Sequence, residues 1–433
     1  MAVIDRGWSW VVSAACFVNM LCVIGLYRAS GVIYSAIIDT FGVTREEATW
    51  PFSLAGTIGL LVSVCNGILC QLFTIRTIAI SATLVSSIGL ALCFTAHEVL
   101  PLTIYLGFIY GKLSINSIIL YRIKIYIIWN ITGFGIGIIN VSCLIITCQY
   151  FKKYKTIAIG VLYAGTATGS FILPPLIEYL LKIYGLRGTF LILSGICLQG
   201  MVAAALYRPQ ELDDAKPNKC EEKLKFASKP AQIISKWVII FRFRIFYLIW
   251  ITYAVYHFTY FIFPTVIVDY ASDLNIKTNK GVFLLSGYCI GDLCGRLSCG
   301  WATDVLRIKK KYVIIASFLL QAVILLITPF YNSYIFLMFV SAGVGYFTGC
   351  LMPQWPVIFA DYLGLTHLPF AIGTVLTLTG FLPFCFPYII GYYRDIKGSY
   401  SSLYFTCAGI NLLAVLLWSL EHLFVDRPIN SPS

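Results

Sequence analysis

Charged side chains are scarce in this chain of 433 residues, of which only 12% are Asp, Glu, Lys or Arg and 59% are hydrophobic. Soluble domains carry about 25% charged residues, so the composition excludes a water-soluble globular protein. The mean hydropathy of +0.85 is typical of a chain that crosses a bilayer repeatedly. No small-residue cleavage site follows the first apolar run, which begins at Trp8, and we therefore expect this run to be a retained span rather than a leader.

Patterns that carry catalysis or hold metals are also missing. The 15 cysteines include no Cys-x-x-Cys pair, and the 4 histidines form no cluster with them, which argues against a zinc site and a disulfide framework. The sequence contains no Gly-rich phosphate loop ahead of a lysine and no nucleophile elbow. We predict that the chain is not an enzyme and has no catalytic residues, no metal site and no cofactor.

Positive charge is nevertheless in surplus, with a formal net charge of +12. The basic residues lie in short clusters between apolar runs, where they act as topology signals, and this placement argues against a nucleic-acid partner. Most of them fall on the side of the predicted spans that also holds both chain ends. The positive-inside rule therefore predicts that both termini are cytoplasmic.

Apolar stretches of the length that a helix needs to cross a bilayer, about twenty residues, recur along the whole chain. They cover residues 9–34, 50–73, 76–95, 101–149, 156–180, 188–206, 243–268, 280–302, 312–330, 333–356, 368–392 and 400–424. The predicted fold class is an all-α membrane protein with twelve transmembrane helices in two six-helix halves. The first half is 1–206 and the second is 239–425, joined by a polar cytoplasmic linker, 207–238, and followed by a cytoplasmic tail, 426–433.

The fourth of these stretches is too long for a single crossing. Joining residues 103–111 directly to 131–149 would produce a glycine-rich span of ordinary length, so residues 112–130 form an anomalous insertion. Its Ile, Lys, Asn and Tyr content matches A/T-rich codons, and Gly111-Lys112 is what a GGTAAR splice donor encodes. We hypothesise a retained intron; the alternative is a genuine insertion that forms an amphipathic hairpin or a surface helix on the outer side.

Two opposite charges, Asp292 and Arg296, lie four residues apart within the eighth apolar stretch. On a helix this spacing places them on one face, within reach of each other. A charged side chain at the centre of a bilayer costs about 2.5–3.5 kcal/mol on insertion scales, so such residues usually line a cavity or a substrate path. The alternative is a neutralised pair with a structural role. We favour the transport path because the chain crosses the membrane many times.

Two loops in matching places of the two halves carry a family signal. The loop after the eighth stretch contains Gly300 and, four residues on, Asp304, followed by basic residues. The loop after the second stretch keeps Gly67 but has Gln71 at the acidic position. With the six-plus-six layout, these loops resemble the Gly-x-x-x-Asp loops of the major facilitator superfamily, and the resemblance implies that fold.

Two further motifs mark the starts of the first and fifth spans. The first has an acidic residue, a glycine and a tryptophan at Asp5, Gly7 and Trp10. The second reads Tyr150, Phe151, Lys152 and Lys153, and continues to Gly160. Both resemble signature motifs of the monocarboxylate transporter family, and the resemblance covers about residues 5–425. The lysines suit a cytoplasmic helix start beside anionic lipid and the glycine suits close helix packing, so we assign these residues gating or structural roles.

The resemblance also implies roles for the charged pair, because proton-coupled members of the family carry an Asp-x-x-x-Arg pair in this span. Arg296 would bind a substrate carboxylate, which its planar fork can meet with two hydrogen bonds. Asp292 would take up a proton or exchange ion-pair partners. The first span departs from the family pattern, since Ala29 stands where a lysine is expected. Arg28 is the candidate replacement; alternatively it snorkels or pairs elsewhere.

A polar-aromatic stripe follows one face of the seventh span, where helical spacing aligns Tyr253, Tyr256, His257 and Tyr260. Tyr256 and His257 are therefore candidate substrate-binding residues. The alternative is ordinary helix packing with satisfied hydroxyl groups. In the tenth span, the sequence Pro-Gln-Trp-Pro at 353–356 predicts a break in the helix, either a gate or a simple kink.

These residues and the resemblance predict a plasma-membrane transporter of small organic anions, in the first instance monocarboxylates such as lactate or pyruvate, that works by alternating access as a proton symporter. An alternative is proton-independent, facilitated transport of aromatic amino acids or other larger organic acids. A third alternative is a non-transporting receptor or accessory protein derived from a transporter. The expected partners are the organic anion, a proton and the lipid bilayer, and the resemblance adds a single-span chaperone subunit, which some family members use.

Overall fold

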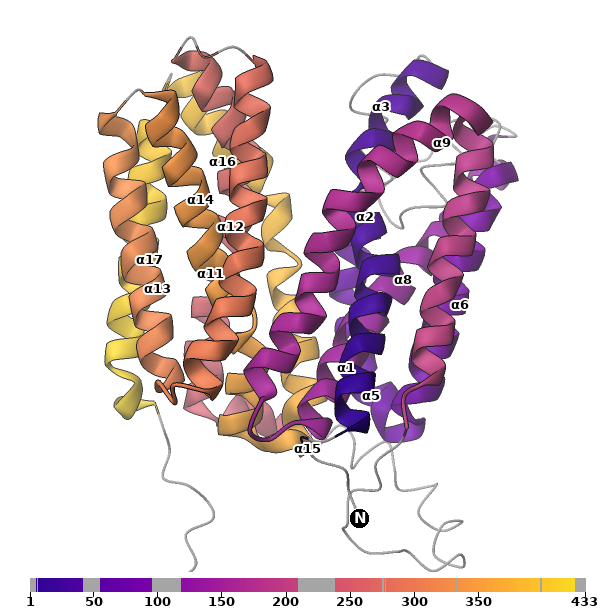
Figure 1. Cartoon of the computed structure of the whole chain (residues 1–433), viewed down its shortest axis with the longest axis horizontal. Helices are drawn as coiled ribbons and strands as arrows, with labels where there is room; N and C mark the ends of the chain where they lie inside the picture. The colour runs from indigo at the N-terminus through magenta and orange to yellow at the C-terminus, as the bar shows by residue number, and fades with distance from the viewer. Residues whose placement is uncertain are drawn as a thin grey trace, which may run out of the picture. The chain divides into compact units, whose positions relative to one another are not determined.

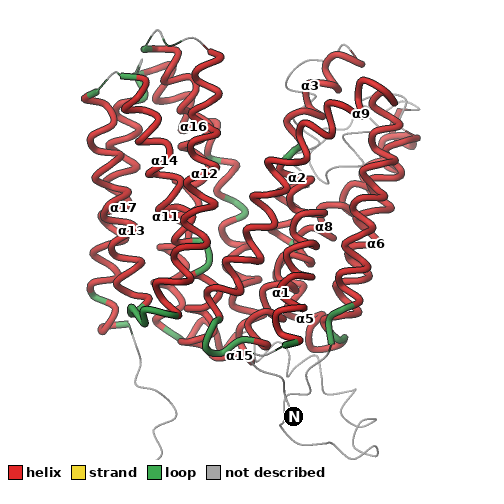
Figure 2. The backbone as a smooth tube through the Cα atoms, in the orientation of Figure 1, coloured by secondary structure: helices red, strands yellow, loops and turns green. Residues whose placement is uncertain are grey.

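The computed structural model describes residues 5, 7–41, 55–95, 118–208, 238–274, 276, 278–331, 333–397 and 399–424. Within these residues every regular element is helical and none is a strand (Figure 1, Figure 2). A helix satisfies its backbone N–H and C=O groups within its own segment, which is what hydrocarbon surroundings require. The all-α prediction is therefore confirmed.

Each of the first six predicted spans contains helical residues. The first span is a nearly continuous run that widens to a π-helix in its middle, and residues 55–61 are also helical and lead through a turn into the next helix. The elements are α1 (Trp8–Asn19), the π-helix η1 (Met20–Gly25), α2 (Leu26–Arg28), α3 (Ser30–Phe41), α5 (Ser63–Leu72), α6 (Ile75–Leu92), α8 (Ile118–Tyr150) and α9 (Lys155–Ala205).

Two predicted spans are joined in α9. At about 1.5 Å per residue, a straight helix of this length would far exceed the roughly 30 Å hydrocarbon core. Figure 1 shows that α9 bends between two arms. The break lies at Gly185, which has a φ of +64°. Glycine adopts this left-handed conformation without a steric penalty. The predicted spans 156–180 and 188–206 therefore correspond to the two arms of α9.

The second half of the sequence forms the remaining helices. They are α11 (Arg244–Asp273), α12 (Thr278–Asp304), α13 (Lys310–Ile327), α14 (Tyr334–Leu351), α15 (Gln354–Thr379), α16 (Phe386–Gly391), the π-helix η6 (Tyr392–Ile396) and α17 (Ser401–Ser419). The chain leaves the helix between Leu351 and Gln354, which confirms the predicted break. A second break lies inside α15 at Gly364, with a φ of +76°, so this helix contributes to both the tenth and the eleventh spans.

Eight helices of the described part are long and apolar enough, by length and composition, to cross a membrane. The number is below twelve because α9 counts once although it holds two spans, and because the eleventh span is divided among α15, α16 and η6. In the second span, α5 has only 10 residues and is too short to be counted. The helix α12 is not among the eight, because its ion pair and several glycines lower its hydropathy. Helices are present in all twelve predicted stretches, which leaves the predicted architecture intact.

The start of α8 bears on the anomalous insertion. This helix begins at Ile118, within the insertion 112–130, and continues without interruption to Tyr150. Residues 112–117 lie outside the described residues. The 18 residues Gly133–Tyr150 suffice for a span by themselves. The described part of the insertion therefore extends the helix of the fourth span and does not form the hairpin or separate surface helix that was the alternative. The hypothesis of a retained intron stays a prediction.

Contacts divide the chain into two compact units. Unit 1 comprises Met1–Phe151, Val161–Asp213 and Ile372–Gly380, and unit 2 comprises Lys152–Gly160, Asp214–Ala371 and Phe381–Ser433. Each unit thus includes a short segment from the other half of the sequence. In unit 1, the Thr377 hydroxyl of α15 donates to the Leu61 carbonyl oxygen at 3.0 Å. In unit 2, Lys155 Nζ of α9 pairs with Asp361 at 3.3 Å.

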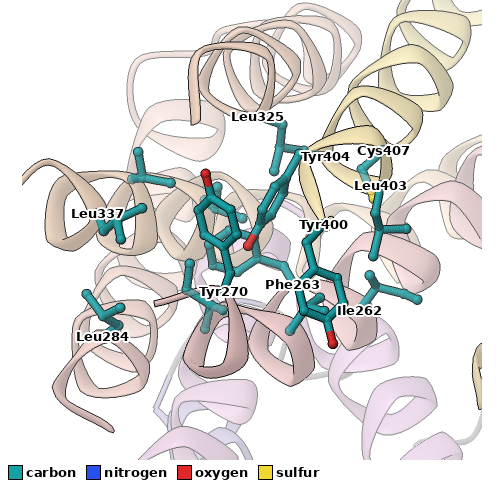
Figure 3. Packing of buried hydrophobic residues seen from close by; sticks show 14 of the residues in the cluster. Ile262, Phe263, Tyr270, Leu284, Leu325, Leu337, Tyr400, Leu403, Tyr404 and Cys407 are labelled. Atoms are coloured by element: carbon teal, nitrogen blue, oxygen red, sulfur yellow. The ribbon is translucent and has the colours of Figure 1, made fainter. Parts of the chain in front are cut away.

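Aromatic and aliphatic side chains form a buried core within unit 2 (Figure 3). Tyr270 of α11 meets Tyr404 of α17 edge to face, with ring centroids 5.0 Å apart. Leu284 of α12 and Leu337 of α14 belong to the same core and are fully buried. Because helices α11, α13, α14, α16 and α17 all contribute to it beside α12, the core holds α12 in a defined position.

The two signature motifs contact each other in unit 1. The backbone N–H of Asp5 donates to the Tyr150 carbonyl oxygen at 3.1 Å. The rings of Trp10 and Phe151 pack edge to face, with centroids 5.0 Å apart. Gly7 has a φ of +37°, in the left-handed region that favours glycine. The motifs therefore join the start of α1 to the end of α8, while Lys152 and Lys153 are exposed.

Candidate functional site

Asp292 and Arg296 form a closed ion pair on α12. Nε of Arg296 donates to Oδ1 of Asp292 at 2.8 Å, and Nη2 donates to Oδ2 at 2.5 Å. Asp292 is 3% exposed and Arg296 is 0% exposed. Two charges buried in this way are tolerable only as a pair, because removing one partner leaves the other uncompensated. The predicted contact across one helical turn is therefore present.

This arrangement provides a way to exchange one anion for another. Both oxygens of Asp292 are bonded to the same guanidinium. A carboxylate of a small molecule has the same geometry and charge, and it can therefore replace the side chain of Asp292 on Arg296. The displaced Asp292 then requires a proton or another cation, because an isolated carboxylate in an apolar medium is strongly disfavoured.

Tyrosines from two helices lie in the electrostatic neighbourhood of the guanidinium. Tyr256 of α11 and Tyr288 of α12 are its electrostatic neighbours besides Asp292. Tyr256 is 3% exposed and Tyr288 is 6% exposed. The predicted candidate Tyr256 is thus close to the ion pair. Tyr288 was missed by the sequence reasoning, although it lies four residues before Asp292 and helical spacing would have placed it on the same face.

The polar-aromatic stripe of α11 is continuous. Tyr256 stacks on Tyr260 at 5.7 Å and packs against Trp355 of α15 at 5.8 Å, both between ring centroids. His257 is 5% exposed and contacts Tyr253 and the ring of Phe261, which is 4.6 Å away. Tyr256 therefore connects the stripe to the ion pair, whereas the ring contacts of His257 are with other members of α11.

Arg28 lies in unit 1, at the end of α2, whereas the ion pair belongs to unit 2. It is half-buried, and the adjacent Ala29 is 3% exposed. The first span is widened to a π-helix at Met20–Gly25 and has a turn at Ala29. A role for Arg28 in binding stays a prediction.

Glycines allow α14 to lie directly on the part of α12 that carries the ion pair. A Cβ atom on Gly349 would overlap the carbonyl oxygen of Asp292, and one on Gly345 would overlap that of Tyr288. In the opposite direction, a Cβ atom on Gly291 would overlap the carbonyl oxygen of Ala342. Such backbone contact is typical of small-residue helix interfaces in membranes. It fixes the height and rotation of α12 at Asp292.

The same contact occurs in the first half of the sequence. Counting eight residues back from the glycines of the two matching loops leads to Gly59 in the first half and Asp292 in the second. A Cβ atom on Gly137 of α8 would overlap the Gly59 carbonyl oxygen, as one on Gly349 would overlap that of Asp292. The two halves therefore repeat one packing pattern, and the charged pair occurs in only one of the copies.

The loop predicted to follow the superfamily pattern is tied to the start of α9. Oδ2 of Asp304 accepts a hydrogen bond from the backbone N–H of Ile157 at 2.9 Å. Ile157 lies in the first turn of α9, where backbone N–H groups lack partners within the helix. Gly300 allows this approach, since a Cβ atom there would lie 2.7 Å from the Cα atom of Ile157. These contacts join the end of α12 to the start of α9, and a structural role for Asp304 and Gly300 stays a prediction.

We expect Asp304→Ala to destabilise the protein by about 1–2 kcal/mol, because the first turn of α9 loses its cap. Asp304→Asn keeps an acceptor and loses only the charge beside the helix dipole, so we expect a smaller loss of about 0.3–1 kcal/mol. Thermal unfolding of the purified protein measures both. Unchanged midpoints for the two variants would contradict the capping role.

Metal ligands do not cluster in the described residues: no group of three or more His, Cys, Asp or Glu side chains there could hold a metal ion. The charged groups near the site are instead the ion pair and, toward the end of α12, Asp304. The guanidinium of Arg296 can bind an anion, and the carboxylate of Asp292 can bind a proton.

The family model of the Major Facilitator Superfamily matches residues 15–277 and 249–432. Monocarboxylate transporter 12 of Rattus norvegicus is 24% identical over 440 residues, which are 95% of this chain and 85% of the relative. Monocarboxylate transporter 13 of Bos taurus is 25% identical over 431 residues, which are 99% of this chain and 93% of the relative. The solved structure of the E. coli fucose:proton symporter FucP has a TM-score of 0.66 at 15% identity, with 96% of this chain and 99% of FucP covered.

Proposed function

This chain belongs to the Major Facilitator Superfamily and, within it, to the monocarboxylate transporter family, and on that premise we propose that it carries small organic anions of the lactate or pyruvate type across the plasma membrane by alternating access. As a member of these families it is a membrane transporter and not an enzyme. The observation that carries the proposal is the buried, doubly hydrogen-bonded pair of Asp292 and Arg296. A guanidinium held in this way is suited to a carboxylate.

In the proposed cycle, the substrate carboxylate takes the place of Asp292 on Arg296. Asp292, at 3% exposed, then takes up a proton, because burial disfavours a free carboxylate. Each anion would therefore enter together with one proton, as in a symporter. Release reverses the exchange: Asp292 loses the proton and pairs with Arg296 again.

A second candidate function is the transport of aromatic organic acids without a proton. It is favoured by the aromatic side chains that adjoin the ion pair, since Tyr256 neighbours Arg296 and packs against Tyr260 and Trp355. Ring stacking against Tyr and Trp would bind an aromatic substrate. The alanine at position 29 in place of the family lysine also favours this candidate.

We expect uptake of labelled lactate to be several-fold faster at an outside pH of 6 than at pH 7.5, because each transported anion would bring a proton to Asp292. The measurement uses cells that express the full chain and cells that express a variant lacking residues 112–130, with surface labelling to normalise for expression. The shorter variant keeps Gly133–Tyr150, which suffices for the fourth span.

Lactate uptake that is equal at the two pH values would contradict proton coupling. No lactate uptake by either form at normal surface expression would contradict the first candidate, and uptake of phenylpyruvate in its place would support the second. Uptake of neither acid would favour the non-transporting receptor or accessory class.

A further inference from the structure

The backbone of the turn that carries the ion pair is contacted from two sides. A Cβ atom on Gly349 of α14 would overlap the carbonyl oxygen of Asp292. On another side, a Cβ atom on Gly160 of α9 would lie 2.5 Å from the carbonyl oxygen of Arg296. Real Cβ atoms do not approach an oxygen so closely, so both glycines are required for the observed packing. The backbone of Arg296 therefore rests directly on α9.

The second of these contacts also repeats in the other half. Ser63 and Arg296 are equivalent in the repeat, because each lies four residues before the glycine of its loop. Gly160 and Gly373 are also equivalent, because each ends a tripeptide Ala-Ile-Gly. A Cβ atom on Gly373 would lie 2.5 Å from the carbonyl oxygen of Ser63, the same distance as between Gly160 and Arg296. The repeat thus supplies a pair of equivalent contacts, one against a charged turn and one against an uncharged turn.

Gly160 lies at the point along α9 where the chain passes from unit 2 to unit 1. Residues Lys152–Gly160 group with unit 2, and the following part of α9, Val161 onward, groups with unit 1. The start of α9 is tied to unit 2 by the bond from Ile157 N–H to Asp304 and by the ion pair of Lys155 with Asp361. Gly160 is therefore the last residue of α9 that belongs to the same unit as α12, and it contacts the backbone of Arg296.

We propose that Gly160 is a positioning residue for substrate recognition: its lack of a side chain lets α9 set the position of the Arg296 backbone and so the direction in which the guanidinium is presented. This inference rests on the proposed function, in which Arg296 binds the substrate carboxylate. Two parallel hydrogen bonds tolerate little displacement, and a misplacement of about 1 Å can cost about a hundredfold in a positioned site. A movement of α9 therefore changes the affinity of Arg296 for its anion.

The first experiment compares Gly160→Ala, Gly373→Ala and Gly195→Ala in proteoliposomes, with the KM and the maximal rate of labelled lactate uptake as readouts. We expect Gly160→Ala to raise KM about tenfold or more, because the displaced turn misdirects the guanidinium. Gly373→Ala disturbs an equivalent contact of an uncharged turn and should lower the rate without raising KM. Gly195, also in α9, has nothing within 4 Å of its Cβ position, and its variant should behave as the parent.

Thermal unfolding tests the same coupling without a transported substrate. The neutral double variant Asp292→Asn with Arg296→Gln is combined with each glycine variant in a double-mutant cycle. Residues in contact give non-additive effects, whereas distant ones add. We expect the shifts of the unfolding midpoint to be non-additive by about 2 °C or more for Gly160→Ala and additive for Gly373→Ala. Additive shifts for both would overturn the proposal.

Arg296→Lys separates a failure of this inference from a failure of the proposed function. If Arg296→Lys leaves lactate uptake unchanged, the proposed binding role of Arg296 fails, and with it the positioning role of Gly160. If Arg296→Lys loses uptake while Gly160→Ala and Gly373→Ala change KM equally, the proposed function stands and the inference about Gly160 is overturned. A raised KM for Gly160→Ala alone, with non-additive midpoints, supports it.

Discussion

Arg296→Gln should reduce uptake about a hundredfold or more and destabilise the protein by about 3–5 kcal/mol. The loss of uptake follows because glutamine cannot supply two charge-assisted hydrogen bonds to a carboxylate, each worth about 1.5–3 kcal/mol. The loss of stability follows because Asp292, at 3% exposed, is left without its guanidinium. Initial uptake rates and thermal unfolding of the purified protein measure the two effects.

The control for this prediction is the neutral double variant, Asp292→Asn with Arg296→Gln. Its two amides remove both charges and can still hydrogen-bond, so part of the lost stability should return while uptake stays absent. This combination separates a folding defect from a loss of binding. Uptake at the parent rate in the double variant would show that the ion pair has only a structural role.

Gly349→Leu should prevent assembly of unit 2 around α12. Even a methyl group on Gly349 would overlap the Asp292 carbonyl oxygen, and the opposing atom belongs to backbone that cannot rotate away. Overpacking in a dense core costs about 1–3 kcal/mol and more where backbone must move. We expect little protein at the cell surface, and an intermediate amount for Gly349→Ala, as measured by surface labelling.

Gly409→Leu is the matched control for Gly349→Leu, because Gly409 of α17 is exposed and nothing lies within 4 Å of its Cβ position. A leucine facing lipid at this position should leave surface expression unchanged. Normal surface expression of Gly349→Leu would refute the direct contact between α14 and the Asp292 turn.

The ion pair shows how much of a site local rules can predict. Asp292 and Arg296 are four residues apart, and a helix brings such residues together whatever surrounds them. The same spacing would have predicted Tyr288, which was overlooked because a tyrosine in an apolar span carries no signal as strong as a buried charge. Trp355 was noticed only as part of a helix break, and its contact with Tyr256 depends on two helices that are far apart in the sequence.

The helix breaks also differ in how far the sequence predicts them. The break near Pro353 was predicted, because a proline lacks the N–H group that a continuing helix needs. Gly185 and Gly364 lie in the intervals predicted between spans, 181–187 and 357–367, so the places of these breaks were predicted. Their form was not, because a glycine in the sequence does not reveal whether its φ is positive or whether a single residue interrupts the helix. The helical extension of the fourth span through residues 118–130 was not predicted either, since the composition of the insertion favoured a retained intron, with a separate surface element as the alternative.

By itself the sequence determined the class of protein, the number and places of the spans, the resemblance to a transporter family and the contact between Asp292 and Arg296. These depend on composition, on the length of apolar runs and on the period of a helix, which are local properties. Only the tertiary structure decided which surfaces hold the ion pair in place: Gly349 on one side, Gly160 on another, and Tyr256 beside the guanidinium. Such contacts depend on how the helices pack in three dimensions, because a residue's neighbours across an interface are set by backbone approach and not by its position in the chain.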